Sequence, residues 1–240
     1  MKKELDVQVV LYKYIIMENI KSFFDSFKEF VWDIIGYLLP GSYLLIVLSI
    51  IIKKDYFVYP TIGTNSDDFY PFIFIVVSYI LGYAIYGLGV MKENILGEYS
   101  YIKKIEEKVK NRRTFSLSKE LLSKYLSAKD VSDDLSSTNL REMRSIVMGF
   151  MPEQDQKVYT FTFRADLSNQ IGNTSIILGV SALVFSILKP FSLDLFNTGK
   201  AFYIIYFCLI FNYILLRQTR NKFYEISLGL PFSIYTAKST

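Results

Sequence analysis

The chain has no histidine and only one cysteine among its 240 residues. The absence of histidine removes the commonest general base, the commonest metal ligand and the usual pH switch. Cys208 lies in an apolar stretch, where a thiol packs rather than reacts, and a single cysteine forms no internal disulfide. The sequence also lacks a Walker-type phosphate loop, a Gly-x-Ser-x-Gly motif and a His/Cys metal cluster. These absences predict a protein that is not an enzyme and uses no catalytic residue, cofactor or metal.

No segment carries a large excess of one charge. The net charge of +4 is spread thinly, because residues 92–166 hold 14 Lys and Arg against 12 Asp and Glu, and residues 1–33 hold five against six. A nucleic-acid-binding surface requires a one-sided basic excess. The sequence therefore predicts no direct binding to nucleic acid.

Charged side chains are missing altogether from four stretches of 19, 23, 22 and 16 residues. A transmembrane helix needs about 20 apolar residues, and the fourth stretch can be extended through residues 195–199 if Lys200 snorkels to the interface. We therefore predict an all-α integral membrane protein with four transmembrane helices in two hairpins, whose first partner is the lipid bilayer. The stretches are residues 34–52, 69–91, 167–188 and 201–216.

The distribution of Lys and Arg predicts the orientation. The loops at 53–68 and 189–200 hold two each, whereas the N-terminal segment holds five, residues 92–166 hold 14 and the tail holds four. Cytoplasmic segments are enriched in these residues, so both termini and the middle segment are expected in the cytoplasm. The predicted divisions are an amphipathic N-terminal helix (1–33), a transmembrane hairpin (34–91), a cytoplasmic helical segment (92–166), a second hairpin (167–216) and a cytoplasmic tail (217–240).

The segments outside the membrane are expected to be largely helical. Residues 4–32 are amphipathic, and this helix either packs on the protein's own cytoplasmic helices or lies in the inner-leaflet interface. Residues 92–113 continue the second span as a charged helix, Ser116 or Ser118 is expected to cap a helix over 119–129, and another helix is expected at about 140–150. Residues 156–166 lead into the third span as helix or extended chain. Together the segments form a small helical cytoplasmic cap.

The first span contains a proline and two glycines. Proline removes a backbone hydrogen bond and kinks a helix, and glycine lets another backbone approach closely. The group is either a structural kink used for packing or a hinge beside a water-filled path. Its residues are Gly36, Pro40 and Gly41.

The second span carries small residues about four positions apart, a pattern that allows close helix contact. These residues serve either packing within the chain or self-association. They are Ser78, Gly82, Gly87 and Gly89.

A polar cluster is expected at the cytoplasmic ends of the third and fourth spans. No Asp, Glu, Lys or Arg lies in mid-membrane, so a charge-translocating relay is not indicated. Polar groups in lipid need partners, so the cluster forms either a structural polar lock or a ligand or ion site. Its members are Arg164, Asp166, Asn169, Asn173, Asn212, Arg217, Arg220 and Glu225.

Two short motifs carry a resemblance: Asp-x-x-Gly-Tyr-Leu-Leu-Pro-Gly at 33–41 and Ser-Tyr-Ile-Leu-Gly-Tyr at 78–83. In these and in its layout, the chain resembles small four-span bacterial membrane proteins of uncharacterised function, some of which accompany anti-phage systems such as type VI CRISPR loci. The resemblance implies a bacterial inner-membrane location and a role as a defence accessory. It implies no catalytic residue.

Two functions remain open. In the first, the protein is a homo-oligomer that perturbs the membrane as a pore or depolarising effector gated from the cytoplasmic cap. In the second, it is a non-conducting anchor or regulator that recruits a cytosolic partner protein. The first predicts a defined oligomer and toxicity on triggering, and the second predicts no leakage and a co-purifying soluble protein.

Overall fold

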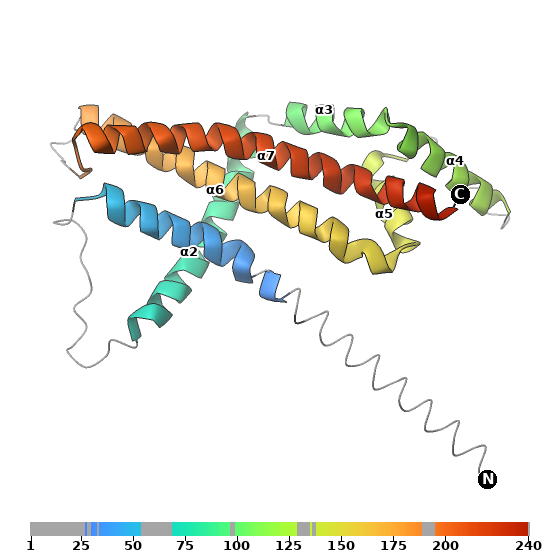
Figure 1. Ribbon diagram of the computed structural model, residues 1–240, viewed down its shortest axis with the longest axis horizontal. Coiled ribbons are helices and arrows are strands. Elements are labelled where there is room, and N and C mark those ends of the chain that lie inside the picture. The colour runs from blue at the N-terminus through green and yellow to red at the C-terminus, as the bar shows by residue number, and fades with distance from the viewer. Residues whose placement is uncertain are drawn as a thin grey trace, which may run out of the picture.

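The computed structural model describes residues 27, 30–32, 34–53, 69–96, 99–128, 135, 138–188 and 195–239, and within these it is helical (Figure 1). The prediction of an all-α protein is confirmed for the described residues. Most of the amphipathic helix expected over residues 1–33 lies outside them. The elements are a first helix over Phe30–Ile51, α2 (Phe69–Leu96), α3 (Tyr99–Lys110), α4 (Arg113–Ser127), α5 (Leu140–Gly149), the 3-10 turn η2 (Pro152–Gln154), α6 (Asp155–Leu188) and α7 (Lys200–Ser239).

Four helices are long and apolar enough to cross a membrane, as predicted. Large hydrophobic side chains point outward along them, for example Phe72, Ile204 and Phe211, which are 59%, 63% and 57% exposed. An apolar surface of this extent suits a lipid environment rather than water. The candidate spans lie within Phe30–Ile51, Pro71–Lys92, Pro152–Leu188 and Lys200–Ser239.

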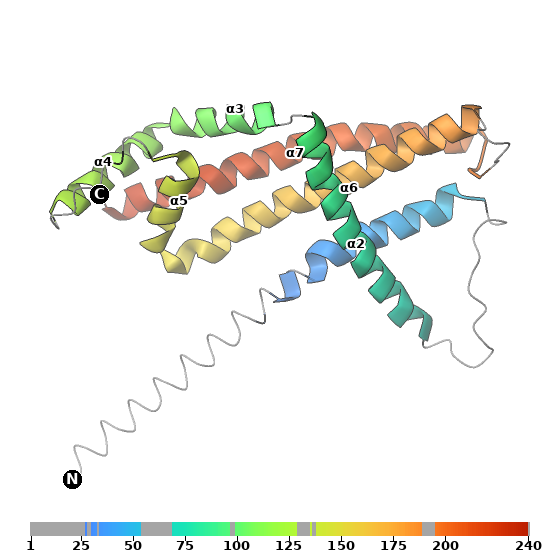
Figure 2. The same cartoon turned by 180° about the vertical axis from the view of Figure 1, so that it is seen from behind.

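The longest elements, α6 and α7, form an antiparallel hairpin that runs the length of the molecule (Figures 1 and 2). Residues 156–166, for which the sequence allowed helix or extended chain, belong to α6. The region predicted as a tail after residue 216 continues α7 without a break to Ser239, through Pro231. One helix of 40 residues therefore joins the membrane-length part to the rest of the protein.

The hairpin is tied to the first helix at the end far from the C-terminus. Lys53 N donates to Leu195 O at 3.0 Å, and Asn197 N donates to Ile51 O at 2.8 Å. The Asn197 amide also donates to Ile50 O and Ile52 O. The bonds that Asn197 donates satisfy carbonyls that the end of the first helix leaves without an intrahelical partner.

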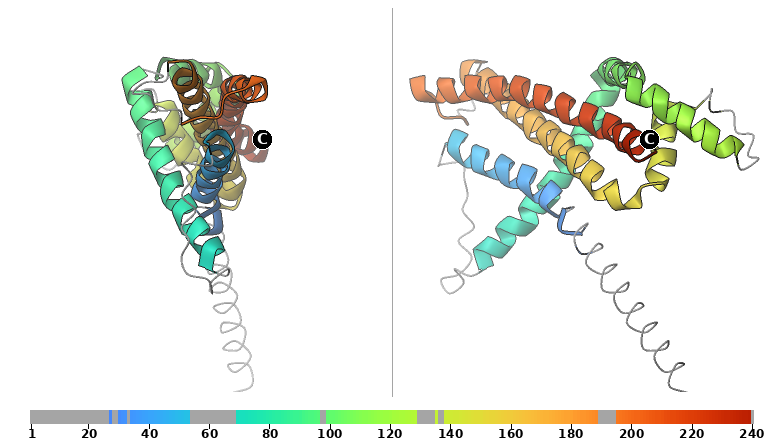
Figure 3. Two further views of the ribbon diagram at one scale, coloured as in Figure 1. Left: turned by 90° about the vertical axis from the view of Figure 1, so that its left-hand side faces the viewer. Right: turned by 45° about the vertical axis from the view of Figure 1, so that its right-hand side comes forward.

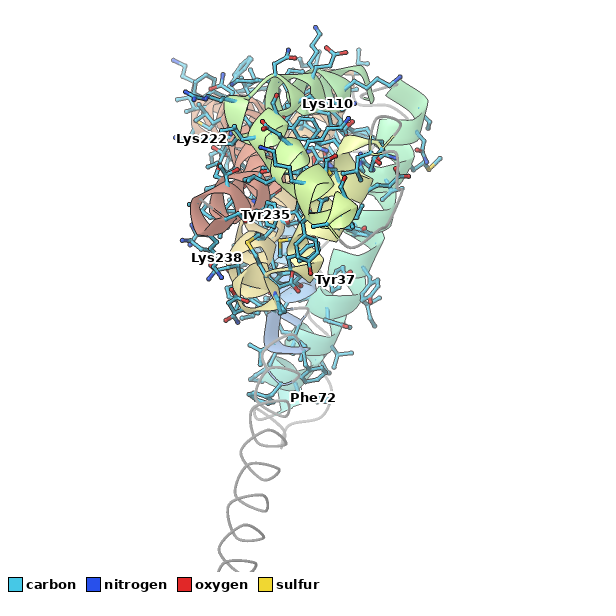
Figure 4. All side chains as sticks on the ribbon, turned by 90° about the vertical axis from the view of Figure 1, so that its right-hand side faces the viewer. Tyr37, Phe72, Lys110, Lys222, Tyr235 and Lys238 are labelled. Atoms are coloured by element: carbon cyan, nitrogen blue, oxygen red, sulfur yellow. The ribbon has the colours of Figure 1, made fainter. Side chains whose placement is uncertain are left out.

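Two separate cores lie along α7. The bundle core lies between the first helix, α6 and the N-terminal half of α7, and the cap core lies between α3, α4, α5 and the C-terminal half of α7 (Figure 3). We call the second unit the cap; Tyr235 lies within it, whereas Phe72 lies at the far end of α2 (Figure 4). The buried bundle residues are Val47, Ile51, Leu178, Ala182, Phe196, Tyr206 and Leu209. The buried cap residues are Ile105, Val109, Leu122, Leu135, Leu140, Met143, Val147, Met151, Leu228, Phe232 and Tyr235.

The cap differs from the sequence prediction at the start of α4. The helix begins at Arg113 rather than at 119, and its N-cap, Arg112, makes no side-chain capping bond. Ser118, expected as a cap, lies inside the helix at 0% exposure. Its hydroxyl shares its proton between Thr114 O at 2.7 Å and Phe232 O at 2.9 Å, and lies 2.9 Å from Thr236 Oγ1. The serine was misassigned because its hydroxyl joins α4 to α7, a long-range contact that a local capping rule does not detect.

Asn139 starts α5 with a capping box, and α5 itself lies where it was predicted. The Asn139 Oδ1 accepts from Arg141 N and Glu142 N, while Asn139 N donates to Glu142 Oε2 at 3.0 Å. We expect Asn139→Ala to lower the free energy of unfolding of the cap by about 1 kcal/mol, since the side chain satisfies helix N–H groups. Thermal unfolding of the purified full chain measures this, and Asn139→Asp should restore most of the loss. Equal midpoints for the alanine variant and wild type would contradict it.

Candidate functional site

The first and second candidate spans cross at a glycine-to-backbone contact. A Cβ at Gly41 would lie 1.7 Å from Ser78 O, and a Cβ at Gly82 would lie 1.8 Å from Tyr37 O. Real Cβ atoms never approach a carbonyl oxygen that closely, so only glycine fits at either position. The two motifs singled out in these spans therefore meet each other inside one chain, where Pro40 and Ser78 are also buried.

Tyrosines surround this crossing. The ring of Tyr37 stacks on Tyr83 at 3.9 Å and meets the edges of Tyr79 and Tyr86 at 5.9 and 6.0 Å. Aromatic pairs in these geometries stabilise beyond the area they bury. Aromatic packing therefore reinforces the glycine contact and holds the first helix against α2.

The remaining small residues have different surroundings. A Cβ at Gly36 would lie 3.1 Å from the Phe163 ring, and a Cβ at Gly89 would lie 3.1 Å from Asn173 Nδ2. Gly87 is exposed, and a Cβ there would meet nothing within 4 Å among the described residues. The four small residues of α2 thus do not form one face, and Gly87 alone remains open to a partner outside the described residues.

Ser175 joins three of the long helices by hydrogen bonds. Its hydroxyl, which carries one proton, donates to Ile171 O at 2.8 Å, so it accepts from Tyr43 OH at 2.7 Å and from Asn212 Nδ2 at 3.1 Å. Ser175 is 0% exposed. A buried hydroxyl with all its bonding capacity used fixes the relative positions of the first helix, α6 and α7.

Immediately on the cap side of Ser175, two cations meet at one phenol. Lys92 Nζ donates to Asn173 Oδ1 at 2.6 Å and to Tyr213 OH at 3.2 Å, and Arg217 donates to the same oxygen at 2.8 Å. Both cations also lie over the Tyr213 ring, at 4.9 and 5.8 Å from its centroid. Bonds from charged donors are stronger than neutral ones, so this group joins α2, α6 and α7 firmly.

Beside this group lie two neighbouring cavities of about 100 and 140 Å³. Tyr86, Asp166 and Gln170 line both of them. Gln170 is 6% exposed, and its Oε1 has no hydrogen-bond partner among the described residues. A buried amide oxygen is costly unless it is bonded, and cavities of this volume have room for several water molecules. The arrangement suits a hydrated polar pocket at the cap end of the bundle.

The eight residues predicted as one polar cluster are divided among separate sites. Asp166, Asn169 and Arg220 line the smaller cavity. Asn173 accepts from Lys92, which donates together with Arg217 to the Tyr213 hydroxyl. The other three lie in different surroundings. Asn212 bonds to Ser175, Arg164 lies 5.8 Å from the ring centroids of Phe161 and Phe223, and Glu225 accepts hydrogen bonds from Lys108 and Arg112 in the cap.

Sequence reasoning missed the residues that connect these sites. Lys92 was counted only as the first charge after the second span, and Tyr43, Gln170 and Tyr213 were not singled out. A cation directly after an apolar run is a usable signal, because it must either reach water or find partners between helices. The tyrosines gave no such signal, since the chain has 19 of them.

Charged groups in the cap form a network that is fixed at neutral pH. Arg141 Nε donates to Glu106 Oε1 at 2.9 Å, and Arg141 also reaches Tyr224 OH. Burial raises the pKa of the Tyr224 phenol and lowers the pKa of the Arg144 guanidinium. A raised pKa keeps the tyrosine neutral at pH 7, and arginine stays protonated because its ordinary pKa lies far above neutrality, so these groups have a structural role.

The described residues contain no group of three or more His, Cys, Asp or Glu that could hold a metal ion, and Cys208 is exposed on α7. The chain matches no family model, no curated protein and no solved structure.

Proposed function

We propose that this protein is a non-enzymatic effector of a bacterial inner membrane that changes the permeability of the bilayer under control of its cytoplasmic cap. One observation carries the proposal: α7 contributes buried residues to both cores, Tyr206 and Leu209 to the bundle and Leu228 and Phe232 to the cap. A passive anchor needs only a span and a linker. A single rigid helix that belongs to both units instead transmits a movement of the cap to the bundle.

The interior of the bundle fits a closed, gated path. Polar groups and cavities lie at the cap end, from Gln170 to Ser175. The interior beyond them is mainly apolar, with Leu178, Ala182 and Leu209 buried, and its buried polar groups are Ser186 and the hydroxyl of Tyr206. An apolar constriction blocks ions by excluding water, even where a polar vestibule leads up to it. Opening would require the apolar part to separate or become hydrated.

This proposal includes self-association. Gly41 and Gly82 already contact each other's helices within one chain, so self-association requires a different surface. Gly87 and the exposed apolar side chains around it, such as Tyr83 and Met91, supply such a surface on α2. A role beside anti-phage systems is supported only by the resemblance of the first two spans, and the cytoplasmic placement of the cap by the distribution of Lys and Arg.

The alternative, a non-conducting anchor that recruits a cytosolic partner, is favoured by one observation. The close-contact glycines that could have served assembly are used inside a single chain. This alternative predicts that a soluble protein co-purifies with the cap and that the membrane stays tight.

The proposal is tested by measuring membrane potential with a voltage-sensitive dye. The bacteria express the chain alone in one experiment and the chain together with its genomic neighbours in a second. We expect depolarisation, and we expect Leu209→Ser to increase its rate at least threefold, because the hydroxyl lets water enter the apolar constriction. Leu215→Ser is the matched control: the residue lies on the same helix but is 47% exposed, whereas Leu209 is 8% exposed. A steady potential for wild type and Leu209→Ser at verified expression would favour the anchor.

A further inference from the structure

A basic groove of about 350 Å³ lies between α3 and α7, just beyond the apolar part of α7. Lys104 and Lys108 of α3 and Gln218, Asn221 and Lys222 of α7 are among its lining residues, and its charged groups are three lysines and one glutamate. Figure 4 shows Lys222 at the outer edge of α7, away from the cap core.

The charge of the groove remains positive after its ion pairs are counted. Its glutamate, Glu225, accepts hydrogen bonds from Lys108 at 2.8 Å and from Arg112, which together outweigh one carboxylate. No ion pair joins Lys104 or Lys222 to any other described residue. The groove therefore presents two lysine ammonium groups to an anion from outside the described part of the chain.

The groove continues a lipid-facing stripe of α7. Ile204, Phe207, Phe211 and Leu215 are 63%, 62%, 57% and 47% exposed, and their spacing of three or four residues places them on one helix face. Gln218 and Lys222 extend the same spacing. At 1.5 Å per residue Gln218 lies about 3 Å beyond residue 216, inside a headgroup layer about 5–8 Å thick, and the Cα atom of Lys222 lies about 9 Å beyond it, at the outer edge of that layer.

We propose that this groove binds the phosphate of an anionic phospholipid, whose acyl chains lie along the apolar stripe of α7. The phosphate bonds to the ammonium groups of Lys104 and Lys222, and Gln218 and Asn221 donate amide hydrogens to the headgroup. Tyr101, which is 42% exposed, also lines the groove and suits the interface between lipid and water. This inference rests on the bilayer placement stated above and does not depend on permeability.

Native mass spectrometry of the full chain in detergent tests the groove by titration with phosphatidylglycerol and, separately, with phosphatidylcholine. We expect phosphatidylglycerol to bind at least tenfold more tightly, because only its headgroup carries a net negative charge. The double variant Lys104→Gln/Lys222→Gln should weaken the binding of phosphatidylglycerol about 25-fold, or about fivefold per lysine, and should weaken the binding of the zwitterionic phosphatidylcholine much less. The matched control is Lys110→Gln/Lys119→Gln, which removes the same charge from cap positions that do not line the groove.

Three outcomes would overturn the inference. Equal losses in the two double variants would mean that lipid is attracted by overall charge and not held in the groove. Displacement of phosphatidylglycerol by low-millimolar inorganic phosphate would assign the groove to a soluble anion. A chain that stays soluble without detergent and binds neither lipid would contradict both the bilayer placement and the lipid site in the groove. In contrast, intact lipid binding together with a steady membrane potential would contradict only the permeability proposal.

Discussion

Gly82→Ala is expected to lower the free energy of unfolding by about 3 kcal/mol, whereas Gly87→Ala on the same helix is expected to raise it by about 0.5 kcal/mol. The added methyl at Gly82 would lie 1.8 Å from Tyr37 O and 2.6 Å from its carbonyl carbon. Backbone atoms have no rotamer by which to move aside, so the two helices must separate. At Gly87 the methyl meets nothing within 4 Å, and the gain in helix propensity remains.

Separation of these helices should be visible without unfolding the protein. The single tryptophan, Trp32, lies on the first helix and packs edge-on against Phe163 of α6 at 4.7 Å. We expect Gly82→Ala to shift the Trp32 emission to longer wavelength at low denaturant, because the first helix no longer sits against both α2 and α6. Gly87→Ala should leave the emission unchanged. Similar emission and similar stability in the two variants would contradict the close crossing.

Substitutions at Gly82 and Gly87 also distinguish an effect on the fold of one chain from an effect on self-association. A leucine at Gly82 cannot test self-association, since its first effect is on the fold of one chain. Gly87→Leu adds a side chain at an open surface position and leaves the crossing intact. If Gly87→Leu changes the oligomeric state in detergent while keeping wild-type stability, α2 carries an association surface.

The helices were predictable because their signals are local. Four charge-free runs of membrane length and the stop at Met151–Pro152 are each visible in consecutive residues, and the helices lie there. The glycine motifs were recognised as sites where another helix approaches closely. The sequence did not show whether that helix belongs to the same chain or to another copy. A pattern of small residues predicts that another helix can pack closely, but it does not identify that helix.

The polar sites were harder to predict because their partners are far apart in the sequence. Lys92 and Tyr213 are 121 residues apart, and Tyr43 and Ser175 are 132 apart. Glu225 was assigned to the wrong group of residues. It follows shortly after the fourth predicted span, so the sequence suggested that it belongs to the polar cluster. The unbroken continuation of α7 carries it instead into the cap, where Lys108 and Arg112 face it.

Phe232→Ala is expected to destabilise the cap by about 4 kcal/mol, while Phe211→Ala on the same helix changes stability by less than about 0.5 kcal/mol. Phe232 is 0% exposed and packs edge-on against Phe115 at 5.0 Å, and its carbonyl binds Ser118. Truncation leaves a cavity between α4 and α7 that the surrounding helices fill only in part. Phe211 is 57% exposed and loses few contacts.

The effect of Phe232→Ala on membrane potential distinguishes a cap that controls permeability from a cap that has no influence on the bundle. Hydrogen exchange should accelerate in α3, α4 and α5 and stay slow in residues 167–188 of α6, because the bundle core shares no buried side chain with the cap core. If the cap controls permeability through α7, the membrane potential of cells that express Phe232→Ala becomes the same with and without the genomic neighbours. A loosened cap combined with an unchanged response to the neighbours would show that α7 transmits no signal, and the control proposed for the cap would then be wrong.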